Sequence, residues 1–164
     1  MLKYLQILLL FFSSIIFSQN SGYQSGSASA NLILPLSIEA GAGNLDFGDI
    51  LITGTIQKKT ILPRNGQQFI VRGQSNRNIS VVFSQVELNN FLWVSNNSAE
   101  SATLNFSPEV QLQNSKDIKS GENLILAPNG LIGEVIFNVG GSIEIEANQP
   151  EGDYEGIFVI SVSY

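Results

Sequence analysis

The sequence lacks the residues on which many enzymes and many small exported domains depend. Its 164 residues include no cysteine and no histidine. This excludes disulfides, thiolate nucleophiles, catalytic triads that use either residue, and zinc sites built on their side chains. Stability therefore has to come from apolar burial and from a complete backbone hydrogen-bond ladder.

Positive charge is also scarce. Eight lysine and arginine residues stand against fourteen aspartate and glutamate residues, for a formal net charge of −6. Proteins that bind a nucleic-acid duplex need clustered basic side chains to displace counterions. Only Lys58 and Lys59 are adjacent here. We therefore expect no nucleic-acid partner, and we expect no cofactor.

The first residues have the pattern of a signal peptide. Lys3 supplies a positive charge, residues 7–17 form an apolar and hydroxyl run, and Ser18 is a small residue suited to cleavage. The run is shorter than the roughly 20 residues of a transmembrane helix. We predict three parts of the chain: a removed leader, a flexible serine- and glycine-rich stretch and a single domain, over residues 1–18, 19–29 and 30–164. The protein is then expected to be exported, to the periplasm, the cell surface or the medium, with no membrane-spanning segment after cleavage.

Apolar and polar residues alternate along the first part of the predicted domain. Apolar side chains occupy every second position: Ala28, Ala30, Leu32, Leu34, Leu36, Ile38 and Ala40. A period of two predicts a β-strand over residues 28–40 with one buried face. Pro35 has no N–H for a ladder, so the strand is expected at a sheet edge or bent at this residue.

The remaining segments repeat this alternation in shorter pieces with turn residues between them. Asn65-Gly66 and Asn129-Gly130 accept the positive φ of tight hairpin turns. Gly140-Gly141 is predicted to join two alternating strands, and residues 89–100 fit either a loop or a short helical turn. Strands at this spacing predict an all-β protein, either an antiparallel β-sandwich or a barrel.

The fourteen acidic residues are enough for a glycosidase, because such enzymes use two carboxylates. Glu144 and Glu146 alternate with isoleucines, and the favoured interpretation is the solvent face of a strand. Asp46, Asp49 and Asp153 are candidate calcium ligands, but no calcium-loop motif surrounds them. Asp46 and Asp49 flank a Phe-Gly turn, which favours capping of backbone groups. We predict no catalytic residue, no metal site and no enzyme activity.

The single tryptophan, Trp93, lies two residues after Phe91. The pair is a candidate stacking platform for carbohydrate, although a lone tryptophan more often belongs to the core or its margin. Phe91 and Trp93 are therefore the candidate ligand contacts of one hypothesis, a monomeric adhesin module that binds carbohydrate or protein.

The C-terminal third has a distinctive pattern. Residues 139–145 read Val-Gly-Gly-Ser-Ile-Glu-Ile, and residues 152–164 end in Phe-Val-Ile-Ser-Val-Ser-Tyr. With Leu-Asp-Phe-Gly at residues 45–48 and the two alternating pieces within residues 69–81, this pattern resembles a secreted bacterial family known as domain of unknown function 4402. That family is similar to fimbrial subunits and to the spore coat protein U domain. The resemblance spans about residues 28–164.

The resemblance implies an immunoglobulin-like sandwich of the pilin or adhesin type, without a known enzyme activity. Pilin relatives usually carry a cysteine bridge, and this chain departs from them in having none. In pilin-like domains, one sheet can lack a strand until a partner supplies it. Such strand addition satisfies the main-chain groups of an open edge and fits alternate side chains into pockets.

Both parts of such a device are present at the ends of the predicted domain. The candidate subunit contacts are the donor residues Leu32, Leu34, Leu36 and Ile38 and the edge residues Phe158, Ile160, Val162 and Tyr164. We expect a non-enzymatic structural or adhesive surface protein. Its expected partners are copies of itself, related surface subunits, a glycan, or a host or cell-surface protein. The alternative that the opening strand pairs within its own domain stays open.

Overall fold

The computed structural model describes residues 27, 29–114 and 116–164. The chain divides into Met1–Leu32 and a compact unit, Ile33–Tyr164. The predicted leader, residues 1–18, and all but two residues of the predicted flexible stretch lie outside the described residues. In the described part of the chain, no helix has the length and hydropathy needed to cross a membrane.

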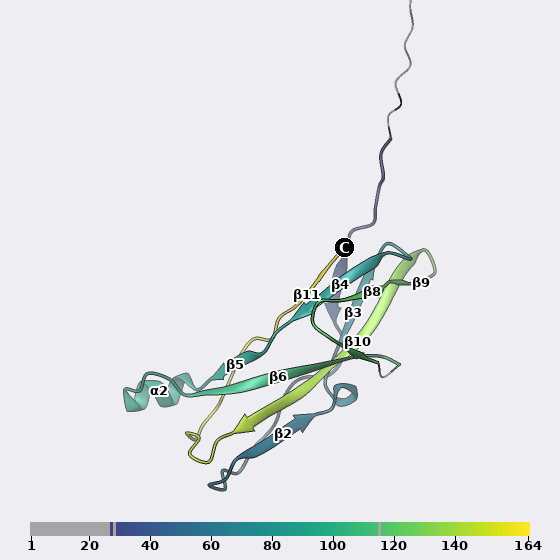
Figure 1. Cartoon of the computed structure of the whole chain (residues 1–164). Helices are drawn as coiled ribbons and strands as arrows, with labels where there is room; N and C mark the ends of the chain where they lie inside the picture. The colour runs from purple at the N-terminus through teal and green to yellow at the C-terminus, as the bar shows by residue number, and fades with distance from the viewer. Residues whose placement is uncertain (1–26, 28, 115) are drawn as a thin grey trace, which may run out of the picture. The chain divides into compact units, whose positions relative to one another are not determined.

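A large antiparallel sheet is built around one long strand, β10 (Ile132–Ile145). Along one side, β10 pairs with β3 (Gln67–Gly73) and then with β2 (Gln57–Ile61), and along the other side it pairs with β6 (Thr103–Leu112). The remaining strands of this sheet are β1 (Ser37–Ala40) beside β3, β5 (Val86–Asn89) and β7 (Asp117–Ile118) beside β6, and β9 (Ala127–Asn129) beside β10. Figure 1 shows β10 as the central strand of this layer.

A second, smaller sheet lies against one part of the large one. It contains three antiparallel strands in the order β11-β4-β8, which span Ile160–Ser163, Asn78–Phe83 and Glu122–Ile125. The connection from β3 to β4 carries the chain from the large sheet to the small one. The structure thus confirms the predicted antiparallel β-sandwich.

The main core lies between the two sheets. Alternate residues of facing strands form it, as a period of two requires. Phe137 and Val139 of β10 and Ile79 and Val81 of β4 are fully buried. Phe69 of β3 stacks on Phe137, with ring centroids 5.9 Å apart. Each of these side chains contributes about 1.5–3 kcal/mol by leaving water, so this region fixes the pairing of the two layers.

A second, smaller core cluster lies on the large sheet beside the part that the small sheet covers. Its buried residues belong to β6 and to the C-terminal part of β10: Leu104, Phe106, Ile143 and Ile145. Partly buried residues of β5 and of two segments without strand structure, residues 45–50 and 154–158, pack against them. Phe106 makes edge-to-face contacts with Phe47 and Phe158, each with centroids 5.9 Å apart. This part of the large sheet is therefore covered by loops instead of by the second sheet.

The prediction of a turn at Gly140-Gly141 is wrong. β10 runs through both glycines without interruption. A Cβ added at Gly140 would collide with the Ile61 carbonyl oxygen and lie 2.5 Å from the Pro63 nitrogen, and one at Gly141 would collide with the Ser107 carbonyl oxygen. The glycines therefore permit close approach of neighbouring backbones at the point where β10 changes its partner from β3 to β2.

The two predicted asparagine-glycine turns have different outcomes. Asn129-Gly130 lies in the hairpin between β9 and β10, and Gly130 has a φ of 63°, as predicted. Asn65-Gly66 does not form a hairpin. Pro63–Asn65 form a 3-10 turn, η1, and Gly66 has a φ of −95°. Because Pro63 favours the start of a helical turn, the chain continues from β2 into β3 in one direction along the same side of β10.

The opening strand is shorter than predicted. Only Ser37–Ala40, β1, forms a strand, and Ala30 to Leu36 lie outside any strand. The ladder begins two residues after Pro35, which has no N–H to donate. β1 lies at an edge of the large sheet, next to β3, which agrees with the position expected from this proline.

Candidate functional site

The four candidate donor residues fall into two pairs. Leu32 and Leu34 lie outside any strand, and their side chains are 93% and 40% exposed. Leu36 and Ile38 pack against the main core instead. Ile38 belongs to β1, which pairs with β3 of the same chain. The expected apolar face is therefore divided: its second half contacts its own sandwich, and Leu32 and Leu34 are at the surface.

Side chains as well as the backbone attach β1 to its sheet. Arg72 of β3 contacts Glu39 of β1 through Nη1 and Oε2 at 2.7 Å, and Glu134 of β10 through Nε and Oε2 at 2.8 Å. The hydrogen bond to Glu39 and then that to Glu134 raise the pKa of Arg72 above its ordinary value. β1 is thereby joined to both β3 and β10 on the outer face of the sheet.

The candidate edge residues lie in β11 and in the segment before it. Phe158, Ile160 and Val162 are partly buried against the main core. β11 pairs with β4, with Val162 opposite Val81, and within the described residues no strand pairs with its other side. An unpaired strand edge presents N–H and C=O groups that another chain can use.

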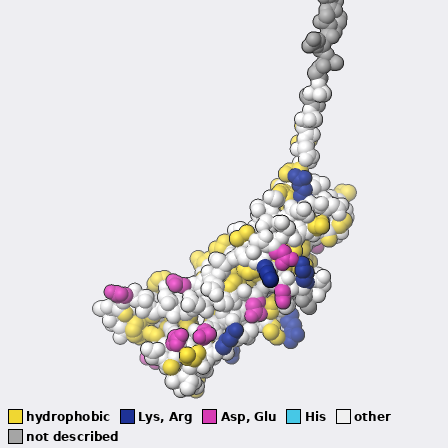
Figure 2. Space-filling model, in the orientation of Figure 1, with side chains coloured by type: hydrophobic (Ala, Val, Ile, Leu, Met, Phe, Trp, Pro, Cys, Tyr) yellow, Lys and Arg dark blue, Asp and Glu magenta, His cyan; other side chains and the backbone are white. Residues whose placement is uncertain are grey.

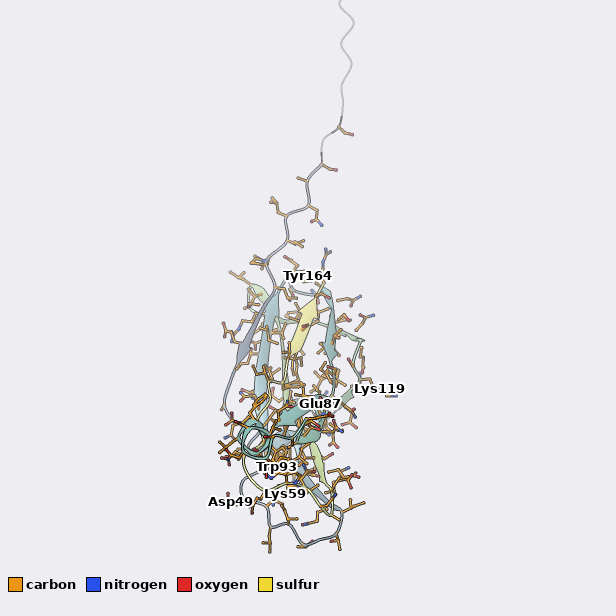
Figure 3. The ribbon with its side chains drawn as sticks, turned by 90° about the vertical axis from the view of Figure 1, so that its left-hand side faces the viewer. Asp49, Lys59, Glu87, Trp93, Lys119 and Tyr164 are labelled. Carbon is orange, nitrogen blue, oxygen red and sulfur yellow. The ribbon has the colours of Figure 1, made fainter. Side chains whose placement is uncertain are left out.

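Tyr164 joins the C-terminus to the opening segment. Its hydroxyl accepts a hydrogen bond from the Gln74 N–H and donates one to the Leu34 carbonyl, both at 2.8 Å. The Leu34 N–H donates to Oε1 of Gln74 at 3.3 Å, and the guanidinium carbon of Arg77 lies 5.7 Å from the centre of the Tyr164 ring. The structure therefore brings one donor candidate and one edge candidate together through a single hydroxyl group. Figure 3 shows Tyr164 at the end of the sandwich far from Asp49.

Phe91 and Trp93 lie in the short helix α2 (Phe91–Asn97), so the helical alternative for residues 89–100 is the right one. The Asn90 side chain begins this helix by accepting a hydrogen bond from the Trp93 N–H at 2.9 Å. Residues two apart on a helix do not face each other, and Phe91 is 72% exposed while Trp93 is half-buried. The two aromatic rings therefore do not share one platform.

Three acidic residues considered for calcium lie around a groove that sequence reasoning did not identify. The groove has a volume of about 890 Å³, and its walls are residues 45–52 and 149–156. Asp46 and Asp49 belong to one wall and Asp153 to the other. Asp46 Oδ1 accepts a hydrogen bond from the Gly48 N–H at 2.8 Å, which confirms the predicted capping of this turn. Among the described residues, no group of three or more carboxylates is placed to hold a metal ion.

The floor of the groove is the second core cluster. Leu104, Ile143 and Ile145 line it from below, while Glu144 and Glu146 are exposed, as the alternation predicted. The signal that could have indicated the groove is local: both walls are turns that combine aspartate and glycine with apolar residues. Residues 45–52 precede β2 and residues 149–156 follow β10, and the pairing of β2 with β10 has no such local signal.

The family of the chain is evident from the span over which one family model matches it. The model described as a domain of unknown function, DUF4402, matches residues 36–164. The chain belongs to this family. No curated protein matches the chain. The DUF4402 match begins at Leu36, so it includes all the strands from β1 to β11 and the whole groove, and it does not include Leu32 or Leu34.

One wall of the groove in this DUF4402 domain is fixed by side-chain hydrogen bonds. Nε2 of Gln149 donates to the Thr103 carbonyl at 3.0 Å and to the Tyr154 hydroxyl at 2.8 Å, and this hydroxyl donates to the Pro150 carbonyl at 2.7 Å. The buried Asn90 side chain donates to the Glu151 carbonyl at 2.9 Å. Asn90 therefore supports both the start of α2 and the wall of the groove.

Proposed function

We propose that this chain is an exported, non-enzymatic structural or adhesive subunit that assembles with other copies by β-strand addition. The observation that carries the proposal is the pair Leu32 and Leu34. Both are large apolar residues at alternate positions, both are exposed, and neither lies in a strand. An alternating apolar segment of this kind is suited to form a strand on a neighbouring sheet.

The edge of β11 is the matching acceptor. Its main-chain groups are unpaired on one side within the described chain, and its apolar residues Ile160 and Val162 point to the main core. The segment before Pro35 of one copy would extend the small sheet of the next copy along this edge. β1 would stay paired with its own β3, and Pro35 would separate the two ladders.

The free energy gained by burying the two leucines limits how strong this contact is. Burying Leu32 and Leu34 contributes about 3–6 kcal/mol at most, from about 1.5–3 kcal/mol for each side chain. Association costs about 4–15 kcal/mol in lost freedom of motion. Main-chain hydrogen bonds along β11 therefore have to supply the rest, and assembly is expected to depend on concentration.

The exposure of the acidic groups supports a non-enzymatic role. A carboxyl that acts as a general acid near neutral pH is usually buried among apolar groups, which raises its pKa. The carboxylates around the groove, Asp46, Asp49, Glu151, Asp153 and Glu155, are all exposed. The leader-like pattern of residues 1–18 is the support for export.

The test is the size distribution of the purified chain over a range of concentrations. Leu32→Ser with Leu34→Ser should abolish the larger species. Leu51→Ser with Leu131→Ser is the matched control, because these leucines are 81% and 97% exposed and lie elsewhere. A deletion that ends at residue 34 should have the effect of the first variant and leave β1 intact. A chain that is monomeric at all concentrations, or a control that loses assembly equally, would contradict the proposal.

A monomeric adhesin is the second candidate function, and the exposed tip of α2 favours it. Phe91 and Leu92 are adjacent and are 72% and 71% exposed. Binding to a glycan array or to cell-surface protein that is lost in Phe91→Ala, and retained in Leu32→Ser with Leu34→Ser, would support this candidate. Since Trp93 is half-buried, Trp93→Ala is expected to disturb the helix as well as any binding.

A further inference from the structure

The groove between residues 45–52 and 149–156 combines an apolar floor with a rim of one charge sign. Leu104, Ile143 and Ile145 form the floor, where they are 3–7% exposed, and the apolar side chains of one wall are more accessible, with Ile50 half-buried and Ile52 37% exposed. Its volume of about 890 Å³ lies within the range of roughly 300–1,000 Å³ that ligand sites occupy. The groove therefore has the size of a binding site, and its accessible apolar surface lies on one wall.

The charged residues of the groove are all acidic. Asp46, Asp49, Glu151, Asp153 and Glu155 line it, and no lysine or arginine does. Within the part of the chain that the structure describes, none of the five forms an ion pair. Figure 2 shows acidic side chains among hydrophobic ones toward the end that carries β2 and α2, with basic side chains beside them over β2. The rim thus presents five carboxylates that no ion pair among the described residues neutralises.

The arrangement of the carboxylates indicates what kind of positively charged ligand suits the groove. No three carboxylates among the described residues are grouped to hold a metal ion. The charge is distributed along two walls, which suits a ligand with several separate positive groups. The accessible isoleucines of one wall, Ile50 and Ile52, suit apolar side chains that lie between those groups.

We propose that this groove binds an extended segment of a partner protein in which lysine or arginine residues flank apolar side chains. The apolar side chains contact Ile50 and Ile52, and the basic side chains pair with carboxylates of both walls. The wall anchored by Asn90, Gln149 and Tyr154 is already ordered, which lowers the entropic cost of binding. This groove is not the acceptor for strand addition, because the donor segment, residues 29–36, carries no positive charge to pair with the carboxylates.

A short peptide that alternates lysine with leucine is the probe, and calorimetric titration of the full chain is the measurement. Asp49→Lys with Asp153→Lys changes one carboxylate on each wall. Glu109→Lys with Glu144→Lys is the control, because both residues are exposed outside the groove. Asp46 is left unchanged because it caps the Gly48 turn. One exposed ion pair is worth roughly twofold to threefold in affinity, and a reversal adds a similar repulsion, so the groove variant should bind at least about tenfold more weakly.

A second pair of variants tests the apolar contact. Ile52→Ser should weaken binding, whereas Ile56→Ser should not, because Ile56 is 62% exposed and does not line the groove. Added salt should weaken binding of the parent chain. Four results would each overturn the proposal: no binding of the probe, equal binding of the peptide with glutamine in place of lysine, equal loss in the control with Glu109→Lys, or equal binding of a neutral peptide of residues 29–36. The last result would make the groove an acceptor for strand addition instead.

Discussion

Replacing Gly141 of β10 by alanine is expected to destabilise the protein more than an ordinary surface substitution does. Gly141 has a φ of 145°, which side chains rarely adopt, and an added Cβ would collide with the Ser107 carbonyl oxygen and lie 2.6 Å from Cε2 of Phe106. Gly140 has the same kind of restriction, because its added Cβ would lie 2.5 Å from the Pro63 nitrogen. At both positions the neighbour is backbone, which cannot move without disturbing a strand or η1.

The magnitude follows from two costs. A residue held in such a backbone conformation costs about 1–3 kcal/mol, and overpacking beside fixed backbone costs about 1–3 kcal/mol more. Gly141→Ala should therefore lower the free energy of unfolding by about 2–6 kcal/mol, out of about 5–15 kcal/mol for a typical domain. Gly130→Ala is the control. Gly130 has a φ of 63° with no atom within 4 Å of an added Cβ, so only the conformational cost of about 1–2 kcal/mol applies.

The assay is equilibrium unfolding in urea, followed by the fluorescence of Trp93 and by far-ultraviolet circular dichroism. Gly141→Ala and Gly140→Ala should both shift the midpoint further than Gly130→Ala, without a change of slope. If the two β10 variants were no less stable than the control, the close approach at the β2–β3 junction would be refuted. The glycine pair would then be a turn, as its sequence alone suggested.

Three further outcomes follow from single side chains. Asn90→Ala should lower the free energy of unfolding by about 2–4 kcal/mol, because it removes a helix cap worth about 1 kcal/mol and a partly buried hydrogen bond to Glu151 worth about 1–3 kcal/mol. Urea unfolding measures the loss, with the exposed substitution Asn97→Ala as the control. Tyr164→Phe should cost about 1–2 kcal/mol and speed hydrogen exchange of the Gln74 amide, which loses its acceptor; unchanged exchange would contradict the contact. Glu122 has its pKa lowered from the ordinary 4.5, first by the hydrogen bond from Lys116 and then by that from the Lys119 N–H. The contribution of Glu122 to the free energy of unfolding is therefore complete above pH 4.5 and is lost as the pH falls through the lowered pKa of Glu122 in the folded protein. The difference in stability between the parent and Glu122→Gln should therefore disappear in acid. A difference that stays constant with pH would contradict this.

The fold was predictable because most strands have one buried face. The alternation around Val81 and Phe137 specifies which side of each strand meets the core, and a set of such strands without cysteine has few ways to bury those sides except between two sheets. The same alternation predicted too long a strand at the N-terminal end. Leu32 and Leu34 continue the pattern of Ile38, but a pattern of side chains does not show whether a partner backbone lies alongside, and Pro35 ends the ladder.

The errors at glycines have a related cause. Gly140-Gly141 and Asn129-Gly130 both look like turns, because a lack of side-chain bulk serves a turn and a close backbone approach equally well. Only the distant residues Ile61 and Ser107 distinguish the two cases, and their proximity to β10 is a consequence of the tertiary structure. The capping role of Asp46, in contrast, depends on a neighbour two residues away and was predicted correctly.

The unequal size of the two sheets explains why the groove lies where it does. The small sheet has three strands, so its apolar face covers the main core but does not reach Leu104 and Ile145. Those residues still have to leave water, and residues 45–50 and 154–158 cover them. Segments without a strand ladder satisfy their backbone groups through turns, which favour aspartate and glycine. An acidic rim over an apolar floor is therefore what results when loops take the place of a missing sheet, and binding would make use of charges that the fold already requires.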